Sequence, residues 1–210
     1  MIDSLYLGPS YDLSHIKGEK VNTMDVAKLI RQRNVVAIFQ GKSEAGPRAL
    51  GNRSILYDPT DPNGKDRINR IKRRESFRPF AGSVLLPHVH DWFDMAGLDE
   101  SPFMMYAVDA LSHTYDKIPA VLHVDKTCRV QTVGLKDNTN YYQLIDSFYQ
   151  LTDVPILFNT SFNLAGEPLV ETPEDAIECF ESSEIDYLYF PEVQLIRGKR
   201  KFLPLLSIKY

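Results

Sequence analysis

The segment GKSEAGPRALGNRSIL at residues 41–56 combines two arginines, three glycines and a proline, one residue after the apolar run VVAIF. Its arginines, Arg48 and Arg53, lie five positions apart. Arginine binds phosphate or carboxylate oxygens through a rigid two-pronged fork, and glycine lets the backbone come close to such a group. The segment therefore predicts one wall of an anion-binding site. A loop with surface salt bridges has a similar composition, and the residues alone leave both interpretations open.

A second group of cations lies in KRRESFRPF at residues 72–80, which contains Lys72, Arg74 and Arg78. Arginine supplies a planar set of donors, whereas lysine supplies a compact charge on a flexible stem. Several such groups near a glycine-rich loop suit a compound that carries more than one phosphate. A solvated basic helix face is the alternative interpretation of this run.

The segment FNTSFNLAGEPLV at residues 158–170 places amides and hydroxyls after a buried apolar run. Asn159, Ser161 and Asn163 can bind a small polar ligand at the end of a strand without adding charge. The alternative is a hydrogen-bonded turn, because asparagine and serine favour turns. Taken alone, this segment favours the turn.

Three further patterns argue against other classes of site. GKS at residues 41–43 resembles the end of a Walker A motif, but that motif requires a glycine where this chain has Val36. The pair His88 and His90 has no third metal ligand nearby in the sequence, so we expect no metal site. No Ser/His/Asp or Cys/His order is recognisable, which gives covalent catalysis no specific support.

The elements that must position these residues show helix and strand patterns in no strict alternation. Helices are expected at residues 22–33, 65–74, 89–96, 138–153 and 172–180. Strands are expected at residues 35–40, 77–86, 103–110, 120–125, 129–133, 154–159 and 186–190. Thr23 and Thr172 are expected to be helix N-caps, with Pro173 at a first helical position. The mixed order predicts an α/β or α+β sheet domain.

The bulk composition is that of one globular domain, residues 1–210, with an irregular lead-in at 1–20 and a charged tail at 197–210. The net charge is −4, which gives no chain-wide footprint for binding nucleic acid or anionic membrane. No secretory signal pattern and no run of about 18 apolar residues occurs, and the two cysteines form no C-x-x-C. We therefore expect a cytoplasmic protein without a membrane partner.

Three segments together resemble a known family: GKSEAGPRALGNRSIL, INRIKRRESFRPFAGSVL, and HVDKTCRVQTV followed by PILFNTSFNLAGEPLV. They are similar to the C-terminal domain of the nodulation-type O-carbamoyltransferases, a family that includes antibiotic carbamoyltransferases. The resemblance covers roughly residues 5–195. It implies a YrdC-like fold, an open twisted mixed sheet flanked by helices with a basic concave face. It also implies that the domain uses carbamoyl phosphate and ATP with Mg²⁺ to make carbamoyl adenylate.

The resemblance implies roles for particular residues. A Lys-x-Arg signature falls on Lys72 and Arg74, with Arg78 as the alternative to Arg74, and a Ser-x-Asn signature falls on Ser161 and Asn163. Catalytic roles are therefore expected for Lys72, Arg74, Arg78 and Ser161. Binding of carbamoyl phosphate or ATP is expected from Arg48, Arg53, Arg129, Asn159 and Asn163.

Members of this family also carry a large N-terminal, Kae1-like domain that holds a metal and transfers the carbamoyl group to an acceptor hydroxyl. The chain resembles only the C-terminal part, and the expected partner is a separate Kae1-like transferase subunit. A fragment of a longer chain and another use of the domain stay open as alternatives. The acceptor would be a sugar, an antibiotic or a modified nucleobase, so nucleic acid enters only as an acceptor. Two alternatives stay open: a nucleotide- or RNA-binding YrdC-like module without its own chemistry, and a threonylcarbamoyl-adenylate synthase.

Overall fold

The structure is a computed structural model that describes residues 5–46 and 48–199. The strands are β1 (Glu19–Lys20), β2 (Val36–Phe39), β3 (Arg53–Tyr57), β4 (Ala81–Leu85), β5 (Phe93–Asp94), β6 (Ala107–Ala110), β7 (Thr127–Val133), β8 (Ile156–Ser161), β9 (Tyr187–Phe190) and β10 (Leu195–Gly198). The α-helices are α1 (Thr23–Arg31), α2 (Gly64–Ile71), α3 (Val89–Trp92), α4 (Thr139–Thr152) and α5 (Pro173–Ser182).

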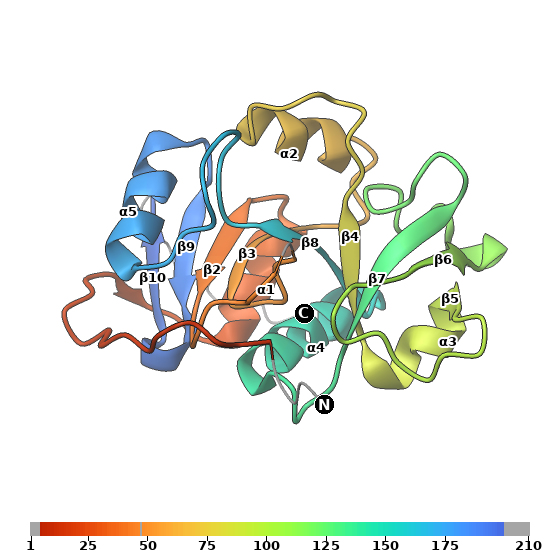
Figure 1. Ribbon diagram of the computed structural model, residues 1–210, viewed down its shortest axis with the longest axis horizontal. Coiled ribbons are helices and arrows are strands. Elements are labelled where there is room, and N and C mark those ends of the chain that lie inside the picture. The colour runs from red at the N-terminus through yellow and green to blue at the C-terminus, as the bar shows by residue number, and fades with distance from the viewer. Residues whose placement is uncertain (1–4, 47, 200–210) are drawn as a thin grey trace, which may run out of the picture.

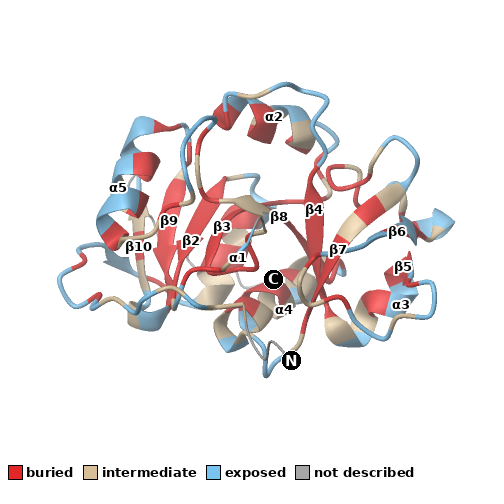
Figure 2. Ribbon diagram, in the orientation of Figure 1, coloured by how far each residue is buried: buried red, intermediate tan, exposed pale blue. Residues whose placement is uncertain are grey.

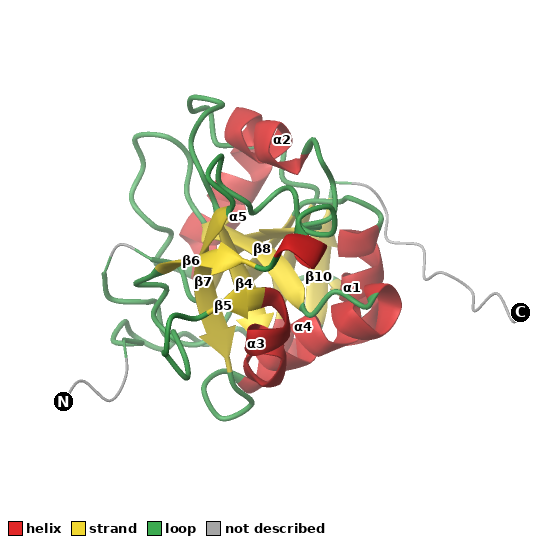
Figure 3. Ribbon diagram, turned by 90° about the vertical axis from the view of Figure 1, so that its right-hand side faces the viewer, coloured by secondary structure: helices red, strands yellow, loops and turns green. Residues whose placement is uncertain are grey.

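All ten strands of the described residues join one sheet in the order β1-β10-β9-β2-β3-β8-β4-β7-β6-β5 (Figure 1). The pairs β2–β9 and β4–β7 are parallel, and the other neighbours are antiparallel. Helices α1 and α4 pack against each other beside the sheet, as Figures 1 and 3 both show. The sheet is therefore open and mixed, with helices against it, which agrees with the expected fold class.

The core lies between the central strands and these helices (Figure 2). Strands β2, β3, β4 and β9 are buried along their whole length. Strand β8 begins buried at Ile156 and becomes partly exposed at Thr160 and Ser161. Its polar end therefore emerges from the core at one edge of the molecule while its apolar start anchors it.

Helix caps explain two of the element boundaries. Thr172 caps α5 by accepting from the Asp175 backbone N–H, and Pro173 takes the first helical position as expected. The cap of α1 is Asn22 and not Thr23, because the Asn22 side-chain oxygen accepts from the backbone N–H three residues later. The prediction for α1 was therefore wrong by one residue.

Several predicted elements end elsewhere. Residues 120–125 form turns and no strand: Ala120 to Leu122 are buried, Val124 is 97% exposed, and none of these residues joins the sheet. The basic helix expected at 65–74 stops at Ile71, and the expected strand at 103–110 begins only at Ala107. The strand at 186–190 is followed by β10, so Arg197 belongs to the sheet and not to a solvated tail. The remainder of the expected tail, from residue 200, lies outside the described residues, as does Pro47.

Candidate active site

Lys72 joins two segments that are distant in the sequence. It follows α2 directly, where the backbone turns through Arg73 with a left-handed φ of 54°. The Lys72 ammonium donates to the carbonyl and hydroxyl oxygens of Ser161 at 2.6 and 3.2 Å. It also donates to the carbonyl and side-chain oxygens of Asn163 at 3.0 and 2.9 Å. The structure therefore brings the expected Lys-x-Arg and Ser-x-Asn segments into direct contact.

The surroundings of Lys72 are buried and positive. The residue is 3% exposed, and burial, with the nearby charge of Arg74 as the second cause, lowers the pKa of Lys72 to about 7. Its acceptors are neutral, so they give less compensation for burial than a carboxylate would. Among the ion pairs of the described residues, none involves Lys72, Arg74 or Arg129. An anion that enters here meets the guanidinium groups of Arg74 and Arg129, which none of these ion pairs occupies, and a Lys72 that is positively charged below a pH of about 7.

Arg74 is held rigidly beside Lys72. Its Nε donates to the side-chain oxygen of Asn69 at 2.7 Å, and its guanidinium lies 4.3 Å from the ring centre of Phe80. Burial, together with the nearby charge of Arg78, lowers the pKa of Arg74 to about 10. The side chain thus has support from both a hydrogen bond and an aromatic face.

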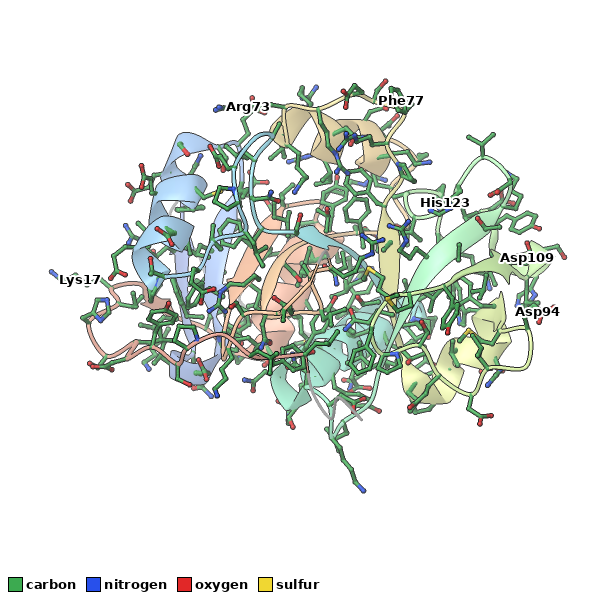
Figure 4. The ribbon with its side chains drawn as sticks, in the orientation of Figure 1. Lys17, Arg73, Phe77, Asp94, Asp109 and His123 are labelled. Carbon is green, nitrogen blue, oxygen red and sulfur yellow. The ribbon has the colours of Figure 1, made fainter. Side chains whose placement is uncertain are left out.

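Arg78 lies farther out on the loop between α2 and β4, the loop whose residues Arg73 and Phe77 are labelled in Figure 4. Its side chain is exposed and pairs with Glu75 at 3.1 Å. A surface pair of this kind is weak and readily exchanged for another anion. Arg78 is therefore placed to contact the outer part of a ligand.

Two cavities adjoin at Arg74 and Ser161. The smaller, of about 130 Å³, has a lining that includes Arg48, Arg74, Ala81, Arg129, Asn159 and Ser161. The larger, of about 340 Å³, has a lining that includes Lys72, Arg73, Arg74, Arg78, Ser161 and Asn163. Arg74 and Ser161 therefore lie at the boundary between the two cavities.

The register of three strands builds the floor of the smaller cavity. Ala81 of β4 is paired with Asn159 of β8 on one side and with Arg129 of β7 on the other. The small side chain of Ala81 leaves space between its two longer neighbours. Burial, and then the nearby charge of Arg48, lowers the pKa of Arg129. The loop at 48–49 and the strand β7 thus place two guanidinium groups near one small space.

Glu44 shapes the glycine-rich segment from inside. One of its carboxylate oxygens accepts from the backbone N–H groups of Leu50 and Asn52, both at 2.7 Å, and of Arg53 at 3.3 Å. Gly51, at a φ of 106°, passes so close to Tyr141 that a Cβ would lie 2.3 Å from the ring. Glu44 therefore folds the segment back on itself and presents its arginine-containing tip to the cavity.

Arg53 does not lie at this site, which corrects the expectation that it binds substrate. It belongs to β3, its side chain is fully buried, and its guanidinium lies 3.6 Å from the ring centre of Phe39. Its donors go to backbone oxygens of Gln40 at 2.6 Å and of Gly41 and Glu171 at 3.2 Å. Its role is structural, because it ties the loop after β2 to the loop before α5.

The described residues contain no group of three or more His, Cys, Asp or Glu side chains placed to hold a metal ion. The two ring nitrogens of His123 lie 2.9 Å from the Thr127 hydroxyl and 3.2 Å from the Phe80 carbonyl. His88 packs against Tyr149. In the same part of the chain, no helix is long and apolar enough to cross a membrane.

A family model described as Carbamoyltransferase C-terminus matches residues 27–197. This chain belongs to that carbamoyltransferase family. Nodulation protein NolO of Bradyrhizobium diazoefficiens is 46% identical over 156 residues, which cover 73% of this chain and 28% of the relative. An uncharacterized protein of Synechocystis is 40% identical over 87% of this chain and 35% of its own length. The carbamoyltransferase domain thus spans about a third or less of these relatives.

Solved structures confirm the fold of this carbamoyltransferase domain. Sua5 of P. abyssi, complexed with L-threonine, superposes with a TM-score of 0.57 at 14% identity, over 82% of this chain and 48% of Sua5. Full-length HypF in its phosphate- and nucleotide-bound form superposes with a TM-score of 0.53 at 16% identity, over 83% of this chain and 24% of HypF. At such identities the likeness concerns the fold alone, and it bears out the YrdC-like open sheet expected from the sequence.

Sequence reasoning missed two residues that support the candidate site. Glu44 and Asn69 make their contacts through backbone groups or across short loops, and no motif spacing identifies them. The expected ligand-binding residues of the site other than Arg53 do line the two cavities: Arg48, Lys72, Arg74, Arg78, Arg129, Asn159, Ser161 and Asn163. Their individual roles stay predictions.

Proposed function

We propose that this domain makes carbamoyl adenylate from carbamoyl phosphate and ATP, to supply a carbamoyl group for an acceptor hydroxyl. The observation that carries the proposal is the junction of the two cavities, where Lys72, Arg74 and Ser161 meet. Membership of the carbamoyltransferase family supports the carbamoyl part of the reaction. The phosphate- and nucleotide-bound form of HypF, which shares the fold, supports the use of ATP.

The chemistry suits residues that position and neutralise charge. Carbamoyl phosphate takes up water and releases phosphate and carbamate. A carbamate oxygen then forms a bond to the α-phosphorus of ATP while the bond to pyrophosphate breaks. Such transfers depend on positioning and on stabilising the charge of the transition state. Lys72, Arg74 and Arg78 would hold the phosphates in the larger cavity, and Ser161 lies where the two reactants would meet.

Mg²⁺ would enter with the nucleotide. Glu75 is the carboxylate in the lining of the larger cavity, and it is paired with Arg78. Mg²⁺ prefers oxygen ligands and keeps several waters in nucleotide sites. We therefore assign its coordination to phosphate oxygens and water, with the domain contributing the arginines around them.

Carbamoyl transfer to the acceptor would take place in a further domain. The matched relatives are about three times as long as the region they share with this chain. We propose a Kae1-like transferase, on a separate subunit, as the partner that receives carbamoyl adenylate. Co-purification of such a subunit with the chain from the host cell tests this step. The proposal would be contradicted if no fraction with carbamoylating activity contained such a subunit.

The function is tested by pyrophosphate release from Mg·ATP by the full chain, with and without carbamoyl phosphate. Release that depends on carbamoyl phosphate is expected, and Lys72→Met and Ser161→Ala should abolish it. Arg70→Ala is the matched control, because Arg70 is an exposed cation of α2 outside both cavities. Release that needs threonine and bicarbonate would identify a threonylcarbamoyl-adenylate synthase. Nucleotide binding without release, in folded protein, would identify a binding module.

A further inference from the structure

His123, labelled in Figure 4, connects the start of β7 to the residue before β4. Its Nε2 lies 3.2 Å from the backbone carbonyl of Phe80, and its Nδ1 lies 2.9 Å from the hydroxyl of Thr127. The ring of Phe80 in turn supports the guanidinium of Arg74, which lies 4.3 Å from the ring centre. Thr127 is two residues before Arg129 on β7, so these two side chains lie on the same face of the strand. His123 therefore contacts the segments that carry or support both arginines.

The hydrogen-bond contacts of His123 can all be satisfied only if its ring carries two protons. A backbone carbonyl accepts and cannot donate, so Nε2 must donate to Phe80. The single hydroxyl proton of Thr127 goes to the carboxylate of Asp125 at 2.8 Å, which also accepts from the Thr127 backbone N–H at 3.0 Å. The Thr127 oxygen can then only accept from the ring, so Nδ1 must donate as well. A neutral imidazole has one N–H and leaves one of these contacts without a proton.

The charges around the ring decide whether it gains the second proton. Burial lowers the pKa of His123, and the positive charges of Arg129 on β7 and of Lys65 on α2 act in the same direction. The backbone carbonyl at Nε2 and the carboxylate of Asp125 act in the opposite direction. Asp109 of β6, which is paired with the first residue of β7, is exposed to solvent. An anion beside Arg129 would offset the repulsion between this arginine and a charged imidazole, and so favour the imidazolium.

We propose that His123 is a positioning residue that takes up a proton when an anion binds beside Arg129. The imidazolium donates from both ring nitrogens, to Phe80 and to Thr127, and so fixes the starts of β4 and β7 relative to each other. The inference goes beyond the proposed function and rests on its anion-binding part. By linkage, an anion that favours protonation must bind more tightly to the protonated form by the same factor.

The test uses sulfate as the anion, because its charge stays constant over the range in which histidine titrates. NMR of the imidazole groups of the full chain, over a pH series at constant ionic strength, should show that sulfate raises the pKa of His123. Sulfate should bind at least about threefold more tightly to the protonated form. His88 is the control in the same spectra, because it lies beyond the opposite end of β4, and it should titrate identically with and without sulfate.

His123→Gln keeps a donor for the Phe80 carbonyl but does not titrate. Over the range in which His123 titrates, sulfate affinity measured by calorimetry should fall with rising pH at least about threefold more in the wild type than in this variant. Equal pH profiles for the two proteins would overturn the inference, as would a wild-type His123 that titrates identically with and without sulfate.

Thr127→Val separates the double hydrogen bond from simple attraction between charges. It keeps the size of the side chain and the contact of Nε2, but it removes the oxygen that receives the second hydrogen bond. The effect of sulfate on His123 protonation should shrink to less than about twofold. An undiminished effect would overturn the positioning role. Carbamoyl-phosphate-dependent pyrophosphate release by the wild type decides the proposed function separately.

Discussion

The ammonium nitrogen of Lys72 lies 3.2 Å from the hydroxyl oxygen of Ser161, a residue 89 positions further along the chain. This contact joins the end of α2 to the end of β8 at the junction of the two cavities. The arrangement of both segments therefore depends on one buried lysine.

Anion affinity should depend on pH through Lys72. Burial lowers the pKa of Lys72 to about 7, so its positive charge is lost as the pH rises above that value. Affinity for sulfate, whose own charge stays constant in this range, should fall by up to about tenfold per pH unit above the pKa. Lys72→Arg should remove this inflection, since arginine stays protonated. Calorimetry over a pH series measures it, and identical profiles for the two proteins would refute the assignment.

Glu44→Ala should destabilise the domain by about 2–4 kcal/mol, because it leaves buried backbone N–H groups of the glycine-rich segment without an acceptor. Glu44→Gln keeps a side-chain oxygen and should lose much less. Burial raises the pKa of Glu44, so the folded protein holds a proton that the unfolded chain releases. The free energy of unfolding should therefore fall as the pH rises from about 4.5 through the raised pKa, but stay flat in Glu44→Gln.

Urea unfolding over a pH series checks this prediction. Equal pH profiles in the wild type and Glu44→Gln would show that this carboxyl does not govern the dependence. Full stability in Glu44→Ala would show that the segment does not need the carboxylate.

Arg53→Lys should lower stability by about 2–3 kcal/mol, because lysine cannot reproduce a planar fork to several carbonyl oxygens. Sulfate affinity should change little, since Arg53 lies outside both cavities. The exposed Arg70→Lys serves as the control, with an effect within about 0.5 kcal/mol. An intact unfolding midpoint combined with lost anion binding would reverse the structural assignment of Arg53.

Arg129→Ala should raise the melting temperature slightly without added anion, because it relieves the charge that Arg129 and Arg48 place close together. Functional sites commonly contain groups whose mutual repulsion lowers the stability of the folded protein. Phosphate at one hundred times its Kd should stabilise the wild type by about 2.7 kcal/mol and Arg129→Ala far less. Thermal melts with and without phosphate test both parts, and equal phosphate shifts would count against this arginine as a ligand.

The sequence predicted the sheet class and the meeting of distant motifs, yet it misplaced Arg53. Arg53 is buried over the ring of Phe39. The sequence around it would look the same if its side chain faced solvent, because a loop rich in glycine and arginine does not indicate which way each arginine points in the strand that follows. The sequence also did not predict strand β3, because its first residues belong to the glycine- and arginine-rich segment that was interpreted as a loop.

Other misses come from tertiary contacts that have no periodicity. The run at 120–125 is apolar enough for a strand, but only its first three residues are buried and none of it pairs with the sheet. The side-chain amide of Asn159 donates to the Ala49 carbonyl and that of Gln131 to the Leu50 carbonyl, contacts between distant segments that no spacing in the sequence indicates. Residue types identified the chemistry, and only the fold could show which atoms remain available.

Strand β8 has a consequence for how the molecule is made. It is inserted between β3 and β4, two strands that the ribosome completes much earlier. Until β8 emerges, both of those strands present unpaired edges, which are templates for pairing with other chains. The nascent chain therefore carries these two exposed edges until residues 156–161 emerge, and a chaperone that covers them should raise its yield. Since β8 also carries Asn159 and Ser161, each newly made molecule assembles its candidate site in the same step that joins β3 to β4.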